Sequence, residues 1–460
     1  MSRLNQAENF FDQNREKWLE EFFSFLKFET ISAHKKSQNA MHSCVDWLKE
    51  EMEKGGLTVS EWDTISHPVL FGQNLEAGLD RPTLLIYNHY DVQPVDPLNL
   101  WESPPFEPTI RNGEIYARGA SDDKGQCFYV LKALQAYREL FGTFPINIKL
   151  IIEGDEETGS EGLEGVLGKY KEDLKADAIA IVDLGITNID QPSVTLGVRG
   201  IITMDLEVSG PQKDLHSGVE GGVIHNPIHA LCDMLASIRD KEGRVQIPDF
   251  YSGVKPLSQE EAADLMLEFD HEAYEKIHGT GPHGGEKAFS PRERAWIRPT
   301  LEINGIFGGY QEDGFKTVIP AKAGAKISCR LVPGQDPEVI SNRVQSYFEN
   351  NAPEGIKVKV TPHPGRGHAC KAEISSPIIQ AASSAFTEVF KKKCRFILEG
   401  GSIPVVTELS KVTGGDVAFI GVGLPTDQIH APNEHFGIER LKKGFCIITR
   451  MIDLYSNKEN

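Results

Sequence analysis

Residues 146–160 read INIKLIIEGDEETGS and join an apolar run to a group of acidic residues. The run at residues 146–152 predicts a strand that is buried on both faces. Asp155, Glu156 and Glu157 follow it directly, and carboxylates this close together repel one another. They are tolerated at neutral pH only if water solvates them or positive charge neutralises them. The stretch is therefore either a solvated acidic turn or part of a cation site, and the rest of the chain bears on the choice.

The chain from about residue 80 to residue 185 alternates short apolar runs with helical stretches. This alternation is typical of an α/β domain with a mostly parallel sheet flanked by helices. The predicted strands are residues 83–91, 146–157 and 178–185, and the predicted helices are residues 125–140 and 162–174. The same alternation returns after residue 375, which indicates that both ends of the chain build this domain.

The pattern changes between these two regions. Residues 201–210 read IITMDLEVSG, and the alternation of apolar and polar side chains predicts a strand with one solvated face. Further predicted elements are a helix at residues 226–240 and strands at residues 324–333 and 356–364. We therefore expect an inserted α+β domain at residues 201–367, and a first domain made of residues 1–200 and 368–460.

Composition excludes several classes of protein. The chain has 460 residues, enough for two domains, and its formal net charge of −19 argues against nucleic acid and anionic membranes as partners. The seven cysteines are scattered and form no C-x-x-C pair, so neither a disulfide framework nor a thiolate zinc site is indicated. The first 28 residues resemble an amphipathic helix more than a signal peptide, and no apolar stretch is long enough to span a bilayer. We expect a cytoplasmic protein.

Histidine and acidic residues gather where the predicted strands of the first domain end. They are His89 and Asp91, then Glu153, Asp155, Glu156 and Glu157, then Asp183, and finally His430 after the apolar run at residues 416–423. Asp122 and Asp123 open a predicted helix. Because ligands of open parallel sheets bind outside the carboxyl ends of the strands, we expect these side chains to converge. Histidine and carboxylate without cysteine favour zinc, manganese or cobalt, and two cations about 4 Å apart would neutralise such a group.

Seven motifs together resemble one known family. They are HYDVQPV (89–95), YARGASDDKGQ (116–126), EGDEETGS (153–160), DLHSG (214–218), KTVIPAKAGAKISCRLVPGQDP (316–337), GGSIPV (400–405) and IHAPNE (429–434). They are similar to the dinuclear zinc metallopeptidase family that contains carnosine dipeptidases, cytosolic non-specific dipeptidases, carboxypeptidase G and aminoacylases, and most similar to its dipeptidase branch. The resemblance implies a catalytic domain and an inserted domain that serves as lid and dimerisation surface.

The resemblance also implies roles for the residues of the first domain. The implied metal ligands are His89 and Asp183 for one ion, Glu157 and His430 for the other, and Asp122 as the bridge between them. Glu156 would be the general base, and Asp91 would orient the imidazole of His89. The peptide bond between Asp122 and Asp123 is expected to be cis. Asp155 and His435 are expected to be structural and not ligands.

Further roles fall in the second domain and the glycine-rich loop. By resemblance, His216 reaches the active site of a partner subunit and stabilises the oxyanion there. Arg330 is suited to bind the terminal carboxylate of the substrate, with Thr317, His368 and Ser402 as further contacts. Backbone N–H groups around Ser402 are also expected to approach this anion.

The predicted function is hydrolysis of the amide bond of dipeptides or very short peptides. It would use two divalent ions, Zn²⁺ first with Mn²⁺ or Co²⁺ as alternatives, and a metal-bridging water activated by Glu156. An N-acyl amino acid amidohydrolase of the aminoacylase or desuccinylase type is an open alternative, because it differs only in the acyl part of its substrate. A non-catalytic metal-dependent binding protein is a more distant alternative, and it would not need Glu156.

Overall fold

The computed structural model describes residues 2–456, which divide into two compact units. The first unit is drawn from Met1–Gly197, Lys371–Ile397 and Val405–Asn460, and the second from Val198–Cys370 and Leu398–Pro404. Residues 398–404 thus belong with the second unit, whereas the predicted second domain, residues 201–367, does not include them.

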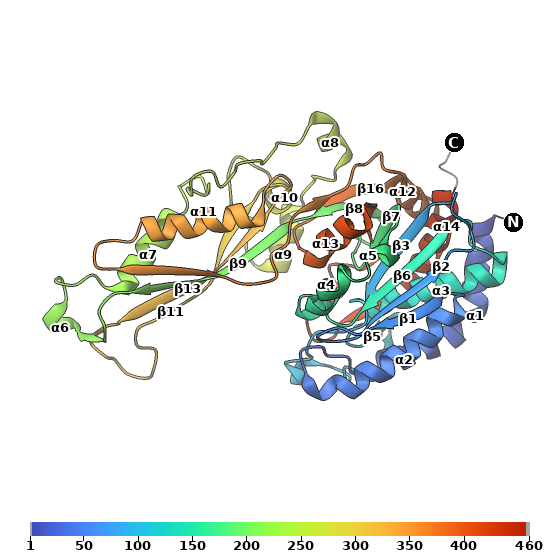
Figure 1. Ribbon diagram of the computed structural model, residues 1–460, viewed down its shortest axis with the longest axis horizontal. Coiled ribbons are helices and arrows are strands. Elements are labelled where there is room, and N and C mark those ends of the chain that lie inside the picture. The colour runs from blue at the N-terminus through green and yellow to red at the C-terminus, as the bar shows by residue number, and fades with distance from the viewer. Residues whose placement is uncertain (1, 457–460) are drawn as a thin grey trace. The chain divides into compact units, whose positions relative to one another are not determined.

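A large mixed sheet forms the centre of the first unit (Figure 1). Its strands are, in spatial order, β1 (Thr58–Trp62), β2 (Val69–Asn74), β6 (Asn147–Glu153), β3 (Thr83–His89), β7 (Ala178–Val182), β17 (Asp416–Ile420), β8 (Ser193–Val198) and β15 (Cys370–Lys371), with β16 (Arg395–Glu399) also paired to β8. The central strands β6, β3, β7 and β17 are parallel, while β1, β2 and β8 pair antiparallel. The α/β class predicted from the sequence is confirmed, with its parallel pairing at the centre of the sheet.

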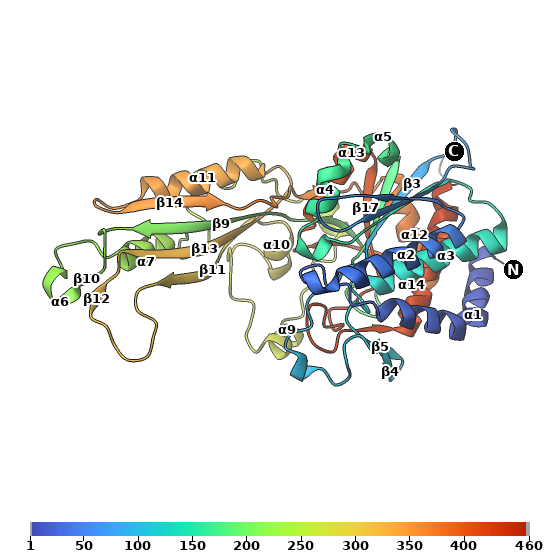
Figure 2. The ribbon, with the colours of Figure 1, turned by 60° about the horizontal axis from the view of Figure 1, so that its bottom comes forward.

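Helices cover both faces of this sheet. They are α1 (Arg3–Leu26), α2 (Gln38–Lys54), α3 (Lys124–Phe141), α4 (Glu161–Leu167), α5 (Lys171–Leu174), α12 (Pro377–Phe390), α13 (Pro404–Thr413) and α14 (Ile438–Ser456). Figure 2 shows α4 and α13 on one side of the sheet, and α2, α3 and α14 on the other. The amphipathic N-terminal segment is indeed a helix, and it buries Phe11, Trp18 and Phe22. A small sheet of β4 (Thr109–Arg111), β5 (Glu114–Tyr116) and β18 (His435–Gly437) completes the unit.

The second unit contains a four-stranded antiparallel sheet. Its strands are, in spatial order, β11 (Thr300–Gly308), β13 (Lys322–Leu331), β9 (Gly200–Ser209) and β14 (Lys357–Pro362). Burial alternates strictly along β9, as the sequence pattern predicts for a sheet with one covered face. The shorter elements are β10 (Leu215–His216), β12 (Val318–Ile319), α6 (Ser217–Glu220), α8 (Gln259–Asp264), α9 (His271–His278) and α10 (Pro291–Trp296).

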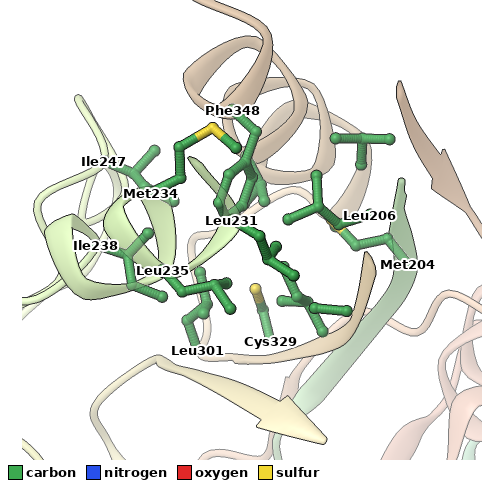
Figure 3. Packing of buried hydrophobic residues seen from close by; sticks show 14 of the residues in the cluster. Met204, Leu206, Leu231, Met234, Leu235, Ile238, Ile247, Leu301, Cys329 and Phe348 are labelled. Carbon is green, nitrogen blue, oxygen red and sulfur yellow. The ribbon is translucent and has the colours of Figure 1, made fainter. Parts of the chain in front are cut away.

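Two helices cover the buried face of this sheet, α7 (Pro227–Ser237) and α11 (Pro337–Asn350). Each starts at a residue whose side chain accepts a backbone N–H bond, Asn226 for α7 and Asp336 for α11, with proline in the next position. Their apolar faces pack on the sheet, and Figure 3 shows this core around Leu231, Met234 and Phe348. Residues of β9, β13 and both helices thus share one hydrophobic core.

All seven cysteines lie within the described residues and are free there. Of the helices in residues 2–456, none is long and apolar enough to cross a membrane.

Candidate metal centre

The central strands deliver the candidate ligands to one edge of the first sheet. His89 is the last residue of β3, Asp183 follows β7 directly, and the turn that carries Glu156 and Glu157 comes three residues after β6. Since β3 lies between β6 and β7 and all three are parallel, their carboxyl ends meet at that edge. Asp122 joins them from the segment just before α3.

Two adjoining groups of potential ligands lie there, and they share one carboxylate. The first group is His89, Asp122 and Asp183, and the second is Asp122, Glu157 and His430, with the ligand atoms of each group within 4.8 Å of one another. Nε2 of His89 lies 3.1 Å from Oδ1 of Asp122, and Nε2 of His430 lies 2.9 Å from its Oδ2. Each oxygen of Asp122 therefore faces a different histidine, the arrangement expected of a bridging ligand.

The local backbone has two unusual features. The Asp122–Asp123 peptide bond is cis, as the resemblance implies. His430 has a φ of 60°, a left-handed conformation that is uncommon for residues other than glycine and clusters at functional sites.

Charges within the two groups shift one another strongly. Hydrogen bonds with Asp122 and Glu157 raise the pKa of His430 to about 10. Burial opposes the ionisation of Asp122, but hydrogen bonds from His430 and His89 outweigh it and hold the Asp122 pKa below its usual range. Burial raises the pKa of Glu157 to about 7. The raised histidine pKa values show that the three carboxylates of the two groups favour positive charge beside them, and divalent cations would supply such charge. The donor set fits two such ions.

Glu156 lies beside these groups and belongs to neither. Burial raises its pKa well above the usual value, and neighbouring carboxylates add to this effect although His89 opposes it. A carboxylate that is near the ligands, not committed to either group, and shifted toward proton binding suits a general base.

Asp91 connects the two sides of the site. Its buried side chain lies 3.3 Å from Nδ1 of His89. Its two oxygens also accept hydrogen bonds from the backbone N–H groups of Glu156 at 3.2 Å and Glu157 at 3.0 Å. The resemblance predicts the contact with His89, but the contacts with the acidic turn were not predicted. One carboxylate thereby sets the positions of a candidate ligand and of the candidate base.

Sequence reasoning missed Glu434 and Gln93. The buried carboxylate of Glu434 accepts hydrogen bonds from Arg118 and from the backbone of Gly119, Ser121 and Asp122. Gln93 donates to Oε2 of Glu157 at 2.7 Å. The available signal was the sequence itself, because Glu434 ends the motif IHAPNE and Gln93 lies inside HYDVQPV.

Asp155 and His435 lie outside both groups. The carboxylate of Asp155 accepts hydrogen bonds from Ser66, Thr158 and the backbone of Gly162, so it stabilises the turn. His435 stacks on Tyr116 in the small sheet.

The candidate substrate contacts in the second unit form two separate sets. Arg330 donates from Nη1 to Oγ of Ser402 at 2.7 Å. Gly367, which precedes His368, pairs with Ile201, the residue opposite Arg330 on β9. His216 lies on β10, and Ser217 donates its backbone N–H to the carbonyl of Thr317. Thr317 precedes β13 whereas Arg330 is near its end, so the two sets lie at opposite ends of this strand.

The glycine-rich loop differs from the expectation. The backbone N–H groups of Gly400 and Gly401 both donate to Oε1 of Glu399, at 2.6 and 3.1 Å. These two N–H groups are therefore already hydrogen-bonded and are not free to bind a substrate anion.

An α/β sheet with two adjoining histidine and carboxylate groups at its carboxyl edge is typical of a metal-dependent hydrolase. The chain belongs to peptidase family M20/M25/M40, whose model matches residues 85–454. It is 33% identical over 370 residues to the Beta-Ala-His dipeptidase of Homo sapiens, covering 78% of this chain and 72% of that protein. It is 29% identical over 465 residues to the Cys-Gly metallodipeptidase of Schizosaccharomyces pombe, covering 96% and 97%. The M20 family metallo-carboxypeptidase Sso-CP2 of Sulfolobus solfataricus has a similar structure, with a TM-score of 0.84, 32% identity and coverage of 95% and 99%.

Proposed function

We propose that this protein is a dipeptidase that uses two divalent metal ions to hydrolyse dipeptides or very short peptides. The observation that carries the proposal is the pair of ligand groups joined through Asp122, with the uncommitted carboxylate of Glu156 beside them. The dipeptidase names of the two relatives support the choice of substrate over the N-acyl amino acid alternative.

The residues would divide the work as follows. One ion would be held by His89, Asp122 and Asp183 and the other by Asp122, Glu157 and His430. Bound ions would polarise the scissile carbonyl and lower the pKa of the attacking water. Zn²⁺ suits this set of nitrogen and oxygen donors, with Mn²⁺ and Co²⁺ as alternatives.

The protein's own groups then move the proton and hold the substrate. Glu156 takes the proton of the attacking water and returns it to the leaving amine. Arg330 binds the terminal carboxylate of the substrate, assisted by Ser402 at 2.7 Å from its Nη1. His368, next to Gly367 whose backbone pairs with Ile201, is a further contact to this carboxylate. His216 stabilises the oxyanion, and Thr317 adds a contact beside it.

The separation of the substrate contacts supports a homodimer. Eight residue steps of β13 separate Lys322, at its start, from Arg330, or about 27 Å at about 3.4 Å per residue of an antiparallel strand. A dipeptide spans only about 7 Å, so it cannot reach both sets in one subunit. We infer that His216 and Thr317 act in the site of a partner subunit. Strand β11 lies at the edge of its sheet within the described residues and exposes Ile303, Ile306 and Phe307, a surface suited to a second copy of the chain.

The test is a comparison of two substrate panels, dipeptides and N-acyl amino acids, assayed before and after metal removal. We expect hydrolysis of dipeptides, loss of that activity on prolonged chelation, and its return with Zn²⁺ or Mn²⁺. Preference for the N-acyl panel would identify an amidohydrolase instead. Full activity after verified metal removal would exclude the two-metal mechanism.

A further inference from the structure

Arg199 lies between β8 and β9 and contacts the glycine-rich loop at two points. Its backbone N–H donates to the carbonyl of Gly401 at 2.9 Å. Its Nε donates to the carbonyl of Gly400, also at 2.9 Å. Two hydrogen bonds from one residue to successive carbonyls fix both the position and the orientation of the loop.

The next residue of the loop, Ser402, faces Arg330. Nη1 of Arg330 donates to Oγ of Ser402 at 2.7 Å, and the backbone of Arg330 lies opposite Ile201, two residues after Arg199. The two arginines thus reach one three-residue loop from neighbouring strands. Burial lowers the pKa of Arg199 to about 10, and the charge of Arg330 adds to this effect. Within the described part of the chain, neither arginine forms an ion pair.

Glycine at position 400 leaves room for Arg199 to contact the loop. A Cβ atom at Gly400 would lie only 3.1 Å from Nη2 of Arg199 and 3.1 Å from the carbonyl oxygen of Ala295. The backbone N–H groups of Gly400 and Gly401 are bound by Glu399, so they offer nothing to an incoming anion. Side chains, with Arg330 and Ser402 among them, are therefore left to bind a carboxylate in this part of the unit.

We propose that Arg199 is a positioning residue for carboxylate binding, which acts by holding the loop so that Ser402 and Arg330 stay paired. The proposal rests on the proposed function, in which Arg330 binds the terminal carboxylate of the substrate. Arg199 then sets the affinity for substrates that carry a free terminal carboxylate, and it has no effect on substrates that lack one.

The experiment compares a dipeptide with the same dipeptide as its C-terminal amide. The variants are Arg199→Met, Arg199→Lys, Arg330→Met, the double variant Arg199→Met with Arg330→Met, and the control Arg343→Met. Arg343 also donates to a backbone carbonyl in this unit, that of Asp249, but does not touch the loop. Thermal midpoints and metal content are measured for every variant.

We expect Arg199→Met to raise KM for the dipeptide about tenfold with kcat changed less than about twofold, as for loss of a charged hydrogen bond that acts on binding. Hydrolysis of the amide should not change. Arg199→Lys should recover part of the loss because it retains one donor, and Arg343→Met should behave as wild type. The double variant should be no worse than Arg330→Met alone, because Arg199 acts through that pair.

Equal losses on the dipeptide and its amide, or additive losses in the double variant, would overturn the proposal. The same comparison is made for binding, by calorimetry of both ligands in the Glu156→Gln background, where turnover is not needed. If the wild-type protein hydrolyses no dipeptide, the proposed function fails, and this binding experiment still decides the role of Arg199.

Discussion

Glu156 and Glu157 are neighbours in the chain, but their surroundings give them different chemistry. Glu157 lies 3.2 Å from Nε2 of His430 and accepts a hydrogen bond from Gln93, both of which suit a ligand. Glu156 belongs to neither ligand group of the described residues, and burial raises its pKa well above the usual value. Asp91 holds the backbone of both residues, so their places in the turn, one residue apart, give the two side chains different neighbours.

Substituting each of these residues by glutamine should separate the two roles. Glu156→Gln should lower kcat by about a thousandfold or more while two metal ions stay bound, because an amide cannot accept the proton of water. Glu157→Gln should lose about one metal ion per subunit, since a neutral amide is a weaker ligand than a carboxylate. Metal analysis of both purified variants, together with kcat, is the measurement. The opposite pattern would mean that the roles are exchanged.

Metal affinity should depend on pH with a definite sign. In the metal-free site the pKa of His430 is raised to about 10 and that of Glu157 to about 7. Because both pKa values are raised, the site holds protons at neutral pH, and metal ions must displace them. Affinity for Zn²⁺ should therefore fall as the pH falls from about 8 to about 6, with proton release on binding. Competition with a fluorescent chelator and calorimetry in two buffers measure this, and a pH-independent affinity would contradict it.

His89 and Asp183 could be predicted as ligands from the sequence, because each comes at the end of a long apolar run. Such a run predicts a buried strand, and ligands of an open parallel sheet bind at the carboxyl ends of its strands. Glu434 could not be selected in this way. Glu434 comes directly before β18. Its carboxylate accepts backbone hydrogen bonds from a segment more than 300 residues away in the chain. No periodicity or local spacing reports such a contact.

At the scale of elements, the loop before α3 depends on that buried carboxylate. Glu434 satisfies three backbone N–H groups and pairs with Arg118 at 2.7 Å, and both side chains are almost fully buried. The loop carries Asp122, so its position controls both ligand groups.

Glu434→Gln should therefore destabilise the protein by about 3 kcal/mol, because it leaves the buried charge of Arg118 and backbone donors without full partners. The matched control is Glu102→Gln, since Glu102 also pairs with an arginine, Arg111, but its side chain is 71% exposed. That change should cost less than about 1 kcal/mol. Chemical denaturation of the chelated proteins gives both values. Equal effects of the two substitutions would show that the loop does not depend on Glu434.

The elements themselves were predictable to different degrees. Continuous apolar runs marked the central strands, and strict alternation marked β9, because each pattern reflects the number of buried faces. The antiparallel strands β1 and β2 were not predicted, since β1 has only Trp62 buried and the apolar run of β2, Val69 to Phe71, is only three residues long. The pairing of Gly400 and Gly401 with Glu399 also escaped prediction, because a glycine-rich loop looks the same in sequence whether its N–H groups are free or bound.

At the scale of the whole molecule, the proposed dimer makes a prediction about mixed subunits. His216→Ala and Glu156→Gln should each be nearly inactive alone. In a heterodimer of the two, one site has its own Glu156 and an intact His216 from the partner, so activity should recover to about half of wild type. Light scattering establishes the dimer, and labelled subunits establish exchange. If exchange is verified and activity does not recover, His216 does not act across the dimer.

The division of the first unit between both ends of the chain also orders its assembly during synthesis. The last ligand of the first group in the chain is Asp183, whereas the second group includes His430. Strand β17, at residues 416–420, must also pair with β7 before the sheet is complete. The ribosome makes the whole inserted unit in the interval. A nascent chain thus carries every ligand of the first group long before His430 exists, but Glu434, which fixes the loop with Asp122, also emerges only with the last segment, so both groups are completed at the end of synthesis.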